Sequence, residues 1–270
     1  MLKKRLIFTL LIDEGIFQLS RNFTLQGVGN LDWLAEYYNF DAISRSVDEF
    51  ILLNVKRNDK NIQEFGKTVI ELSKRCFMPI AAGGGIRSIE DAYQILDAGA
   101  DKLIVNTPVF TQTELITQLV KTFGSQCVVA SIDYKKKNNH TEVFISDGSC
   151  GTGMTVENAV VEAEKLGVGE IYLTSIDRDG TGQGFDLETL SKVVSLCQLP
   201  IIASGGVGHF DHFTEGMLLK GVAATSTANI FNFIANGLTE ARNHIQEQGI
   251  ELALWNFDLM NSYFDEVIPQ

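Results

Sequence analysis

The acidic residue Asp133 is a candidate for acid–base chemistry because of its position in the sequence. Asp133 ends the apolar run Val128–Asp133. A carboxylate at the end of a buried strand is a candidate general acid or base, and the alternative is a structural carboxylate that caps the next loop. Acid–base sites often pair two carboxylates, so that one accepts a proton while the other donates one. The similar run Leu6–Ile12 has Leu11 at the corresponding place. Asp13 follows two residues later, about 6–7 Å further along an extended strand.

Glycines and small polar residues follow five other apolar runs. Backbone amides that glycine leaves accessible, just before a helix N-terminus, are a typical place to bind phosphate. The residues form two groups, one after the third and fourth runs and one after the sixth to eighth. They are Gly85, Asn106 and Thr107, and then Asp179, Gly180, Gly206, Ala228 and Asn229. Two groups predict two phosphate sites and a ligand with a phosphate at each end, unless the glycines only shape tight turns.

Four charged residues lie near the starts of apolar runs. They are Arg5, Glu49, Lys102 and Glu170. If all four side chains point inward, two cations and two anions form a ring, which would satisfy the requirement that buried charges be paired. The alternative is that these are ordinary charges in solvent at the strand ends.

The elements that must position these residues alternate along the chain. Eight short apolar runs read as buried parallel strands: Leu6–Ile12, Phe50–Val55, Pro79–Ala82, Lys102–Val105, Val128–Asp133, Glu170–Thr174, Pro200–Ala203 and Val222–Ser226. Amphipathic segments lie between them: Asn61–Arg75, Ser88–Asp97, Thr113–Phe123, Val156–Leu166, Leu187–Cys197 and Phe210–Leu219. Eight alternations of strand and helix favour a closed (β/α)8 TIM barrel over an open sheet.

A weak internal repeat supports a closed barrel. The segment Met78–Ile86 is similar to Leu199–Val207, with Pro79 and Pro200 121 positions apart. Glu49 and Glu170 show the same offset, which predicts two similar half-barrels; chance similarity between buried strands is the alternative. We expect residues 1–270 to form a single domain with a C-terminal extension from about 250 to 270. That extension is either docked on the barrel or a surface for a partner.

Composition excludes several classes of function. The formal net charge of −12 argues against nucleic acid or an anionic membrane as a partner, and no apolar stretch is long enough to span a bilayer. The four cysteines and four histidines match no metal-binding spacing. We therefore expect no metal, no cofactor and reduced thiols in a cytoplasmic protein. Phosphate remains compatible with an acidic chain because backbone amides can hold it.

Several motifs together resemble the cyclase subunit of imidazole glycerol phosphate synthase. They are KKRLI, GGGIRSIEDA, GADKLIVNT, FGSQCVVASID, GVGEIYLTSIDRDGTGQGFDLE and PIIASGGVG. The resemblance runs from about residue 2 to residue 235. It implies a phosphate-binding barrel of two half-barrels, with a glutaminase partner at the N-terminal face of the barrel. It also implies that ammonia travels through the barrel from this partner to a site at the other end.

The resemblance assigns roles to the residues named above. The family's gate of charged residues falls on Arg5, Glu49, Lys102 and Glu170, and a residue at the glutaminase interface falls on Asp101. The second catalytic aspartate falls on Asp133. The two phosphate sites fall on the two groups of glycines and small polar residues, with Asn229 in place of the family's usual serine.

Three departures from the family pattern put its cyclisation chemistry in question. The first catalytic aspartate falls on Leu11, a lysine of the flexible loop falls on Leu19, and a supporting aspartate falls on Asn54. Loss of one acid–base partner typically costs about 10²–10⁴-fold in rate. Whether the chain is an active lyase is therefore left open.

Such a pattern is similar to that of a paralogous branch in surface-polysaccharide or nonulosonic-acid pathways. Its members supply ammonia, together with a glutaminase and an N-acetyl-sugar amidotransferase, to convert an acetamido group into an acetamidino group. This role is the preferred hypothesis. The alternatives are a genuine cyclase of histidine biosynthesis, with a relocated acid–base group such as Asp13, and a non-catalytic scaffold that activates a glutaminase.

Overall fold

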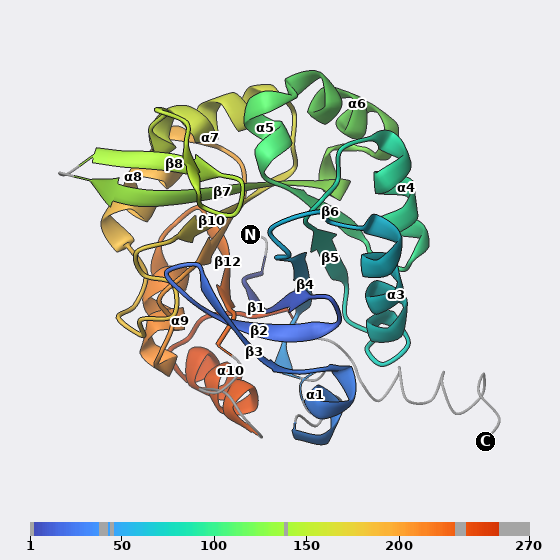
Figure 1. Ribbon diagram of the computed structural model, residues 1–270. Coiled ribbons are helices and arrows are strands. Elements are labelled where there is room, and N and C mark those ends of the chain that lie inside the picture. Colours follow the sequence, from blue (N-terminus) through green and yellow to red (C-terminus); the bar gives the residue numbers. More distant parts are fainter. Residues whose placement is uncertain (1–2, 38–42, 44–45, 138–139, 230–235, 254–270) are drawn as a thin grey trace.

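The computed structural model describes residues 3–37, 43, 46–137, 140–229 and 236–253. Eight parallel strands close into a barrel, which Figure 1 shows approximately end-on. In order around the barrel they are β1 (Arg5–Asp13), β4 (Glu49–Asn54), β5 (Ile80–Gly83), β6 (Lys102–Val105), β7 (Val128–Lys137), β10 (Glu170–Ser175), β11 (Ile201–Ser204) and β12 (Val222–Thr227). Because β10 pairs with β7 and β12 pairs with β1, the sheet closes on itself. The predicted (β/α)8 barrel is confirmed.

Helices surround the barrel, and the six predicted ones are present. These are α3 (Ile62–Ser73), α4 (Ile89–Asp97), α6 (Thr113–Phe123), α7 (Val156–Lys165), α8 (Leu187–Leu196) and α9 (Phe210–Leu218). The structure adds α1 (Leu31–Tyr37), α5 (Thr107–Thr111), α10 (Gly237–Glu247) and a 3-10 turn, Ser125–Cys127. Ser88 caps the N-terminus of α4, since its Oγ accepts a hydrogen bond from Asp91 N at 3.1 Å. In the described part of the chain, no helix has the length and apolarity needed to cross a membrane.

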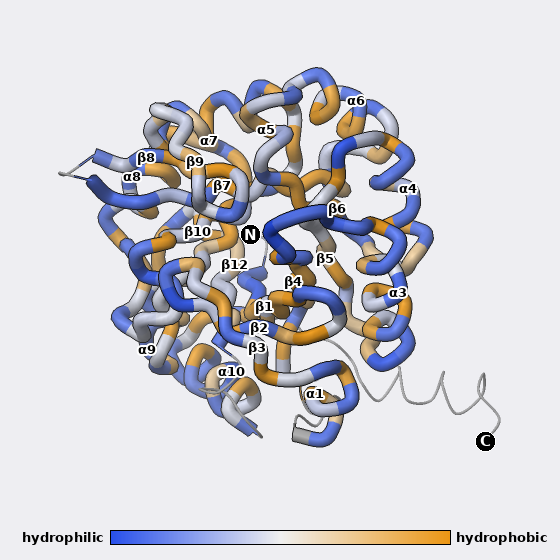
Figure 2. The backbone as a smooth tube through the Cα atoms, viewed as in Figure 1, coloured by the Kyte–Doolittle hydropathy of each residue, from blue (hydrophilic) through white to orange (hydrophobic). Residues whose placement is uncertain are grey.

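Two hydrophobic clusters fill the molecule. The larger one lies between strands and helices, and Figure 2 shows hydrophobic stretches along the strands with hydrophilic loops outside. The smaller one lies inside the barrel and is called the apolar layer below; it consists of Ile7, Ile51, Ala81, Ile104, Val129, Tyr172, Ile202 and Ala224. The strands therefore bury both faces, which explains why their sequences are apolar nearly throughout.

The two halves of the barrel repeat each other in geometry. β4 and β10 are each six residues long and start 121 positions apart, and β5 and β11 show the same offset. Gly84 and Gly205 have φ angles of +99° and +91°. A Cβ on Gly84 would lie 2.2 Å from Asn54 O, and one on Gly205 would lie 2.6 Å from Ser175 O. Equivalent turns thus demand glycine for the same reason in both halves.

Two β-hairpins rise from the C-terminal ends of the barrel strands, and the first of them was not predicted from the sequence. β2 (Ile16–Arg21) and β3 (Thr24–Gly29) form the first, and β2 also pairs with β1. β8 (His140–Ile145) pairs with the long end of β7 and with β9 (Cys150–Gly151). Both hairpins follow short apolar runs that end in polar residues, so the run itself gave no sign that the strand continues.

A buried ion pair joins the N-terminal face of the barrel to the end of the described chain. Asp48 accepts hydrogen bonds from Leu6 N at 2.8 Å and from Arg242 Nη1 at 3.0 Å, and both side chains are buried. Arg242 also donates to the carbonyl of Ala253, and Ala253 N donates to Lys4 O. The chain up to Ala253 is therefore held beside the start of β1. The predicted extension lies, beyond Ala253, outside the described residues, and the single-domain organisation stays a prediction.

We expect Asp48→Ala to destabilise the fold by about 3–5 kcal/mol, because it leaves Arg242 as an uncompensated buried charge. The measurement is the free energy of unfolding in denaturant. Asp32→Ala is the matched control, since Asp32 pairs with Arg75 at an exposed site and should change stability little. Equal effects of the two substitutions would contradict this account.

Candidate functional site

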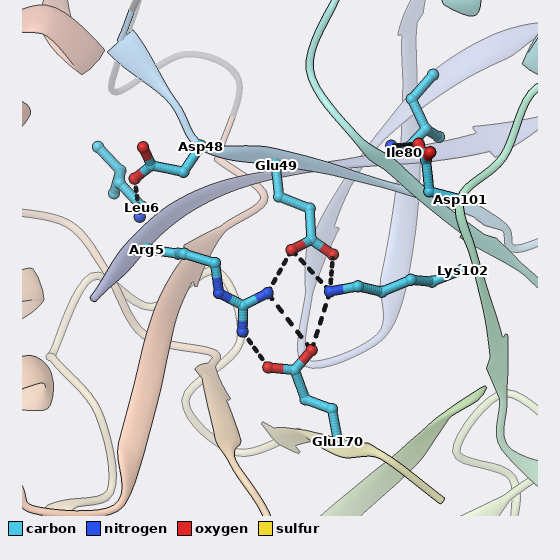
Figure 3. Close-up of polar contacts among 8 residues, drawn as sticks. All are labelled: Arg5, Leu6, Asp48, Glu49, Ile80, Asp101, Lys102 and Glu170. Atoms are coloured by element: carbon cyan, nitrogen blue, oxygen red, sulfur yellow. Dashed lines mark hydrogen bonds and ion pairs between the residues drawn. The ribbon is translucent and has the colours of Figure 1, made fainter. Parts of the chain in front are cut away.

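The four predicted charged residues meet inside the N-terminal end of the barrel. Glu49 and Glu170 each contact both Arg5 and Lys102 (Figure 3). Lys102 Nζ lies 3.0 Å from both carboxylate oxygens of Glu49 and 3.2 Å from Glu170 Oε2. Arg5 bridges the two glutamates from the opposite side. These four side chains are called the charged ring below.

Each member of the charged ring contacts two side chains of opposite sign. Burial acts to lower the pKa of Arg5, but attraction to Glu170 and Glu49 outweighs it and raises the pKa. The glutamate side chains are only 3% and 9% exposed, so solvent screens them little. Directly above them lies the apolar layer, fully buried. The ring therefore closes the lumen at its base in this conformation.

A cavity of about 300 Å³ opens at the other end of the barrel. We call it the mouth cavity. Its lining comes from strand ends and from both hairpins, and includes Leu11, Phe23, Asn54, Lys60, Gly84, Gly85, Asn106, Thr107, Asp133, Asp147, Tyr172, Asp179, Ser204 and Ala228. The volume suits a small molecule, and chemistry at the C-terminal ends of the strands is general for this type of barrel.

Asp133 lies in the mouth cavity with two polar neighbours. Asn106 Nδ2 donates to its Oδ2 at 3.2 Å, and Ser131 Oγ donates to its Oδ1 at 3.4 Å. Burial raises the pKa of Asp133 to about 7, although the Ser131 hydrogen bond acts against it; Asp147 adds to the rise. A carboxyl with such a pKa is suited to proton transfer near neutral pH.

No second carboxylate faces Asp133 from β1. Leu11 lines the cavity there, and Asp13 is not among the lining residues. β1 does continue to Asp13, where it pairs with Ile16 of β2, so the hypothesis that Asp13 takes over the lost role receives no support. Leu19 packs against the main core instead of lining the cavity. Asn54 lines it, and its Oδ1 accepts a hydrogen bond from Lys56 N.

The residues of the first predicted phosphate site lie together in the mouth cavity. Gly85, Asn106 and Thr107 all line it. Thr107 Oγ1 accepts a hydrogen bond from Ser146 N at 3.1 Å, which ties α5 to the second hairpin. Gly85 has φ +104°, and a Cβ there would lie 2.9 Å from Lys60 Cβ. Glycine is thus required by the turn itself, and its role in binding phosphate stays a prediction.

The second predicted group surrounds a smaller adjoining pocket of about 20 Å³. Asp179, Gly180, Gly206, Ala228 and Asn229 all line it, together with Ser20 of the first hairpin. Asp179 accepts hydrogen bonds from Ser20 Oγ and Phe23 N. Burial raises the pKa of Asp179 against these hydrogen bonds. The hairpin tip is therefore held down over this pocket.

Cations around the mouth cavity are a feature that we missed in the sequence. The cavity lining next to the first predicted phosphate site includes three cations, Arg57, Lys60 and Arg87. Lys60 Nζ pairs with Asp147 at 2.7 Å, and Arg57 Nη2 donates to Phe23 O at 2.8 Å. The segment KRNDK, which begins two residues after the end of β4, was the available signal in the sequence. Positive charge at this end favours an anionic ligand despite the acidity of the whole chain.

The predicted partner-facing residue lies at the opposite face from the cavity. Asp101 precedes Lys102 of the charged ring, and its Oδ2 accepts a hydrogen bond from Ile80 N at 2.9 Å (Figure 3). Asp101 is exposed. Among the described residues, no group of three or more His, Cys, Asp or Glu side chains is arranged to hold a metal ion.

A closed barrel of eight parallel strands surrounded by helices, with a cavity at the C-terminal ends of the strands, defines the class of (β/α)8 TIM-barrel proteins. Comparison with known proteins narrows this class: the family model described as "Histidine biosynthesis protein" matches residues 32–234, and this chain belongs to that family. It is 40% identical over 256 residues to a protein of Parasynechococcus marenigrum (strain WH8102) provisionally named imidazole glycerol phosphate synthase subunit hisF2, covering 94% of this chain and 95% of the relative.

Other relatives carry the HisF name without a number. Imidazole glycerol phosphate synthase subunit HisF of Clostridium botulinum (strain Okra / Type B1) is 37% identical over 257 residues, and that of Dictyoglomus turgidum (strain DSM 6724 / Z-1310) is 36% identical over 256 residues. Each match covers 94% of this chain and 100% of the relative. The predicted resemblance to the HisF family is confirmed.

The raised pKa of Asp133 predicts a particular pH dependence of stability. Folding raises this pKa from about 3.9 in an unfolded chain to about 7, so the protonated carboxyl is favoured by folding. That stabilisation is complete below about pH 4 and is lost as pH rises through 7. Asn at this position resembles the protonated form and does not ionise. We therefore expect the difference in unfolding free energy between Asp133→Asn and the wild type to grow by about 2–3 kcal/mol, in favour of the variant, from pH 5 to pH 8.

Denaturant unfolding of both proteins at a series of pH values measures this difference in unfolding free energy. Asp13→Asn is the control, because Asp13 belongs to β1 but lies outside the cavity lining. A gap between the Asp133→Asn variant and the wild type that stays constant with pH would show that the Asp133 carboxyl ionises normally in the folded state.

Proposed function

We propose that this chain receives ammonia from a glutaminase partner at its N-terminal face and passes it through the barrel to the mouth. The observation that carries this is the charged ring, in which four side chains from β1, β4, β6 and β10 pair only around the barrel axis. A ring of buried charges contributes little net stability compared with an apolar plug. Stability alone therefore does not explain the charged ring at the base of the lumen, and a functional role does. Gating of a small polar molecule fits its position.

We further propose that the ammonia serves the conversion of a sugar acetamido group into an acetamidino group, with an N-acetyl-sugar amidotransferase as a further partner. Leu11, which stands opposite Asp133 where the family's pattern has its first aspartate, supports this use over ring closure, because ring closure relies on both aspartates. The cations Arg57, Lys60 and Arg87 support an anionic, phosphorylated ligand at the mouth. Asp101, exposed beside the ring, belongs to the proposed glutaminase surface.

Cyclase activity in histidine biosynthesis is the second candidate. It is favoured by the identity of 36–37% with HisF subunits over their whole length, and by the cavity, where Asp133 and the first phosphate group are brought together. A scaffold that only activates a glutaminase is a third, and it requires no passage through the lumen. The experiments below separate the three.

With ammonium chloride and the ribonucleotide substrate of the HisF relatives, we expect purified protein to turn over at least about 10²-fold more slowly than those relatives, because one acid–base partner is missing. Leu11→Asp should raise the residual rate, since it places a carboxylate at the cavity wall opposite Asp133. Asp13→Asn should leave the rate unchanged. Turnover equal to that of the HisF relatives would overturn the ammonia-supply proposal in favour of the cyclase.

In cells that carry only a Glu49→Gln variant, we expect the acetamidino content of surface polysaccharide to fall several-fold, because Arg5 and Lys102 lose one of their two anions. High external ammonium should restore it, since ammonia then reaches the mouth from solution. Mass spectrometry of the polysaccharide gives the readout. Glu64→Gln, at an exposed pair with Lys67, is the matched control.

The three candidates differ in this cell experiment. A passage role predicts loss and rescue by ammonium, whereas a scaffold predicts unchanged acetamidino content in the Glu49→Gln variant. A histidine requirement of the variant cells, with normal polysaccharide, would favour the cyclase.

A further inference from the structure

A tyrosine lies inside the barrel between the charged ring and the mouth cavity. Tyr172 follows Glu170 by two residues on β10, so its side chain points to the same side of the strand, into the lumen. It belongs to the apolar layer and is only 3% exposed. A phenol at this place puts a hydroxyl group inside an otherwise hydrocarbon layer.

The hydroxyl of Tyr172 reaches across the lumen. Its Oη lies 2.9 Å from Ser204 Oγ on the neighbouring strand β11, and 3.3 Å from Thr9 Oγ1 on β1. Since β11 and β12 stand between β10 and β1 around the barrel, the contact with Thr9 requires the ring to span that part of the interior. Thr9 Oγ1 in turn lies 2.6 Å from Ser226 Oγ on β12. Four hydroxyl groups thus form one chain around the lumen.

The mouth cavity ends at this chain of hydroxyl groups. Tyr172, Ser204 and Ile104 line the cavity, whereas Ile7, Ile51, Ala81, Val129, Ile202 and Ala224, the other members of the apolar layer, do not. All six of these side chains are completely buried. Tyr172 is therefore the side chain that separates the cavity from the apolar layer on the β10–β1 side of the barrel.

The hydroxyl chain is uncharged and surrounded by apolar side chains. Burial raises the pKa of Tyr172, so the phenol stays neutral. An unpaired ion in such surroundings is strongly disfavoured. Neutral ammonia both donates and accepts hydrogen bonds, and it can take the place of one hydroxyl contact when another breaks.

We propose that Tyr172 is a second constriction above the charged ring, closed by its hydrogen bonds to Thr9 and Ser204, which selects neutral ammonia over ammonium ion. The selective role rests on the proposed function. The closure itself is a property of the lumen that can be measured without any partner. Tyr172 acts as a specificity-determining residue. The hydrogen bonds that hold its hydroxyl in place, directly to Thr9 and Ser204 and through Thr9 to Ser226, are called the latch.

Cysteine labelling measures the closure directly. Ala224→Cys places a thiol in the apolar layer, on β12, in a Cys150→Ser background that removes the exposed native thiol. We expect methyl methanethiosulfonate to label this introduced thiol slowly when Tyr172 is present. Tyr172→Phe should speed labelling about tenfold, because two hydrogen bonds of the latch are lost. Tyr172→Ala should speed it by more than about a hundredfold, because the ring itself is lost.

Two controls separate opening of the lumen from general loosening of the fold. Tyr134→Phe removes another buried phenol, whose Oη donates to Asp186 outside the lumen, and it should leave the labelling rate unchanged. The native cysteines Cys76, Cys127 and Cys197 are buried, and their labelling reports unfolding in each variant. Labelling of the introduced thiol that rises only together with labelling of these three cysteines would overturn the proposal, and so would equal rates with Tyr, Phe and Ala at position 172.

The labelling experiment tests the closure of the lumen independently of the ammonia proposal. If labelling shows the closure but ammonium fails to rescue the Glu49→Gln cells, the lumen has a constriction and the passage of ammonia is refuted. If rescue succeeds and labelling does not respond to Tyr172, the passage stands with the charged ring as its gate and the second constriction is refuted. For the selective role, we expect a permanently cationic reagent, [2-(trimethylammonium)ethyl] methanethiosulfonate, to label the introduced thiol far more slowly than the neutral reagent when Tyr172 is present, and this difference should shrink in Tyr172→Ala. A difference that is the same with Tyr and with Ala at position 172 would refute selection by Tyr172.

Discussion

Charge pairing in a confined space is the constraint on which this structure depends. Arg5, Glu49, Lys102 and Glu170 come from four strands that are far apart in sequence, and each must find an opposite charge because water is largely excluded from the base of the lumen. This requirement fixes how those strands start relative to one another. Strand alternation then carries the inward-facing pattern upward, from the charges to the apolar layer and on to the hydroxyl chain.

The two ends of the barrel have opposite electrostatic characters, and this gives the proposed function its physical basis. At the base, Glu49 and Glu170 are each paired with Arg5 and Lys102. The mouth holds Asp133, whose pKa of about 7 reflects burial together with the nearby carboxylates of Asp147 and Asp179, which act against the attraction of Lys60. Leu11 occupies the position on β1 where a second carboxylate would face Asp133. A chain with an intact ring and no carboxylate on β1 opposite Asp133 is better suited to moving a small nucleophile than to performing concerted acid–base chemistry.

Much of this arrangement was accessible before the fold was known. The eight apolar runs predicted the barrel strands, and the spacing of 121 residues between Glu49 and Glu170 holds for strand starts and glycine turns alike. The hairpin β2–β3 was missed although its residues alternate in polarity, because only the continuous apolar runs were interpreted as strands. Tyr172 was missed although Glu170 points inward two residues earlier, because an aromatic residue within an apolar run is ordinarily part of a core.

The sequence by itself determined which residues carry charge, where the eight barrel strands lie and which acid is absent at Leu11, because these are properties of local pattern and residue type. Only the tertiary structure decided that Tyr172 reaches Thr9 across the lumen, that Lys60 pairs with Asp147 at the mouth, and that Asp13 stays outside the cavity. Those facts depend on barrel closure and strand stagger, which bring Tyr172 and Thr9 together over a separation of 163 positions and which no local pattern encodes.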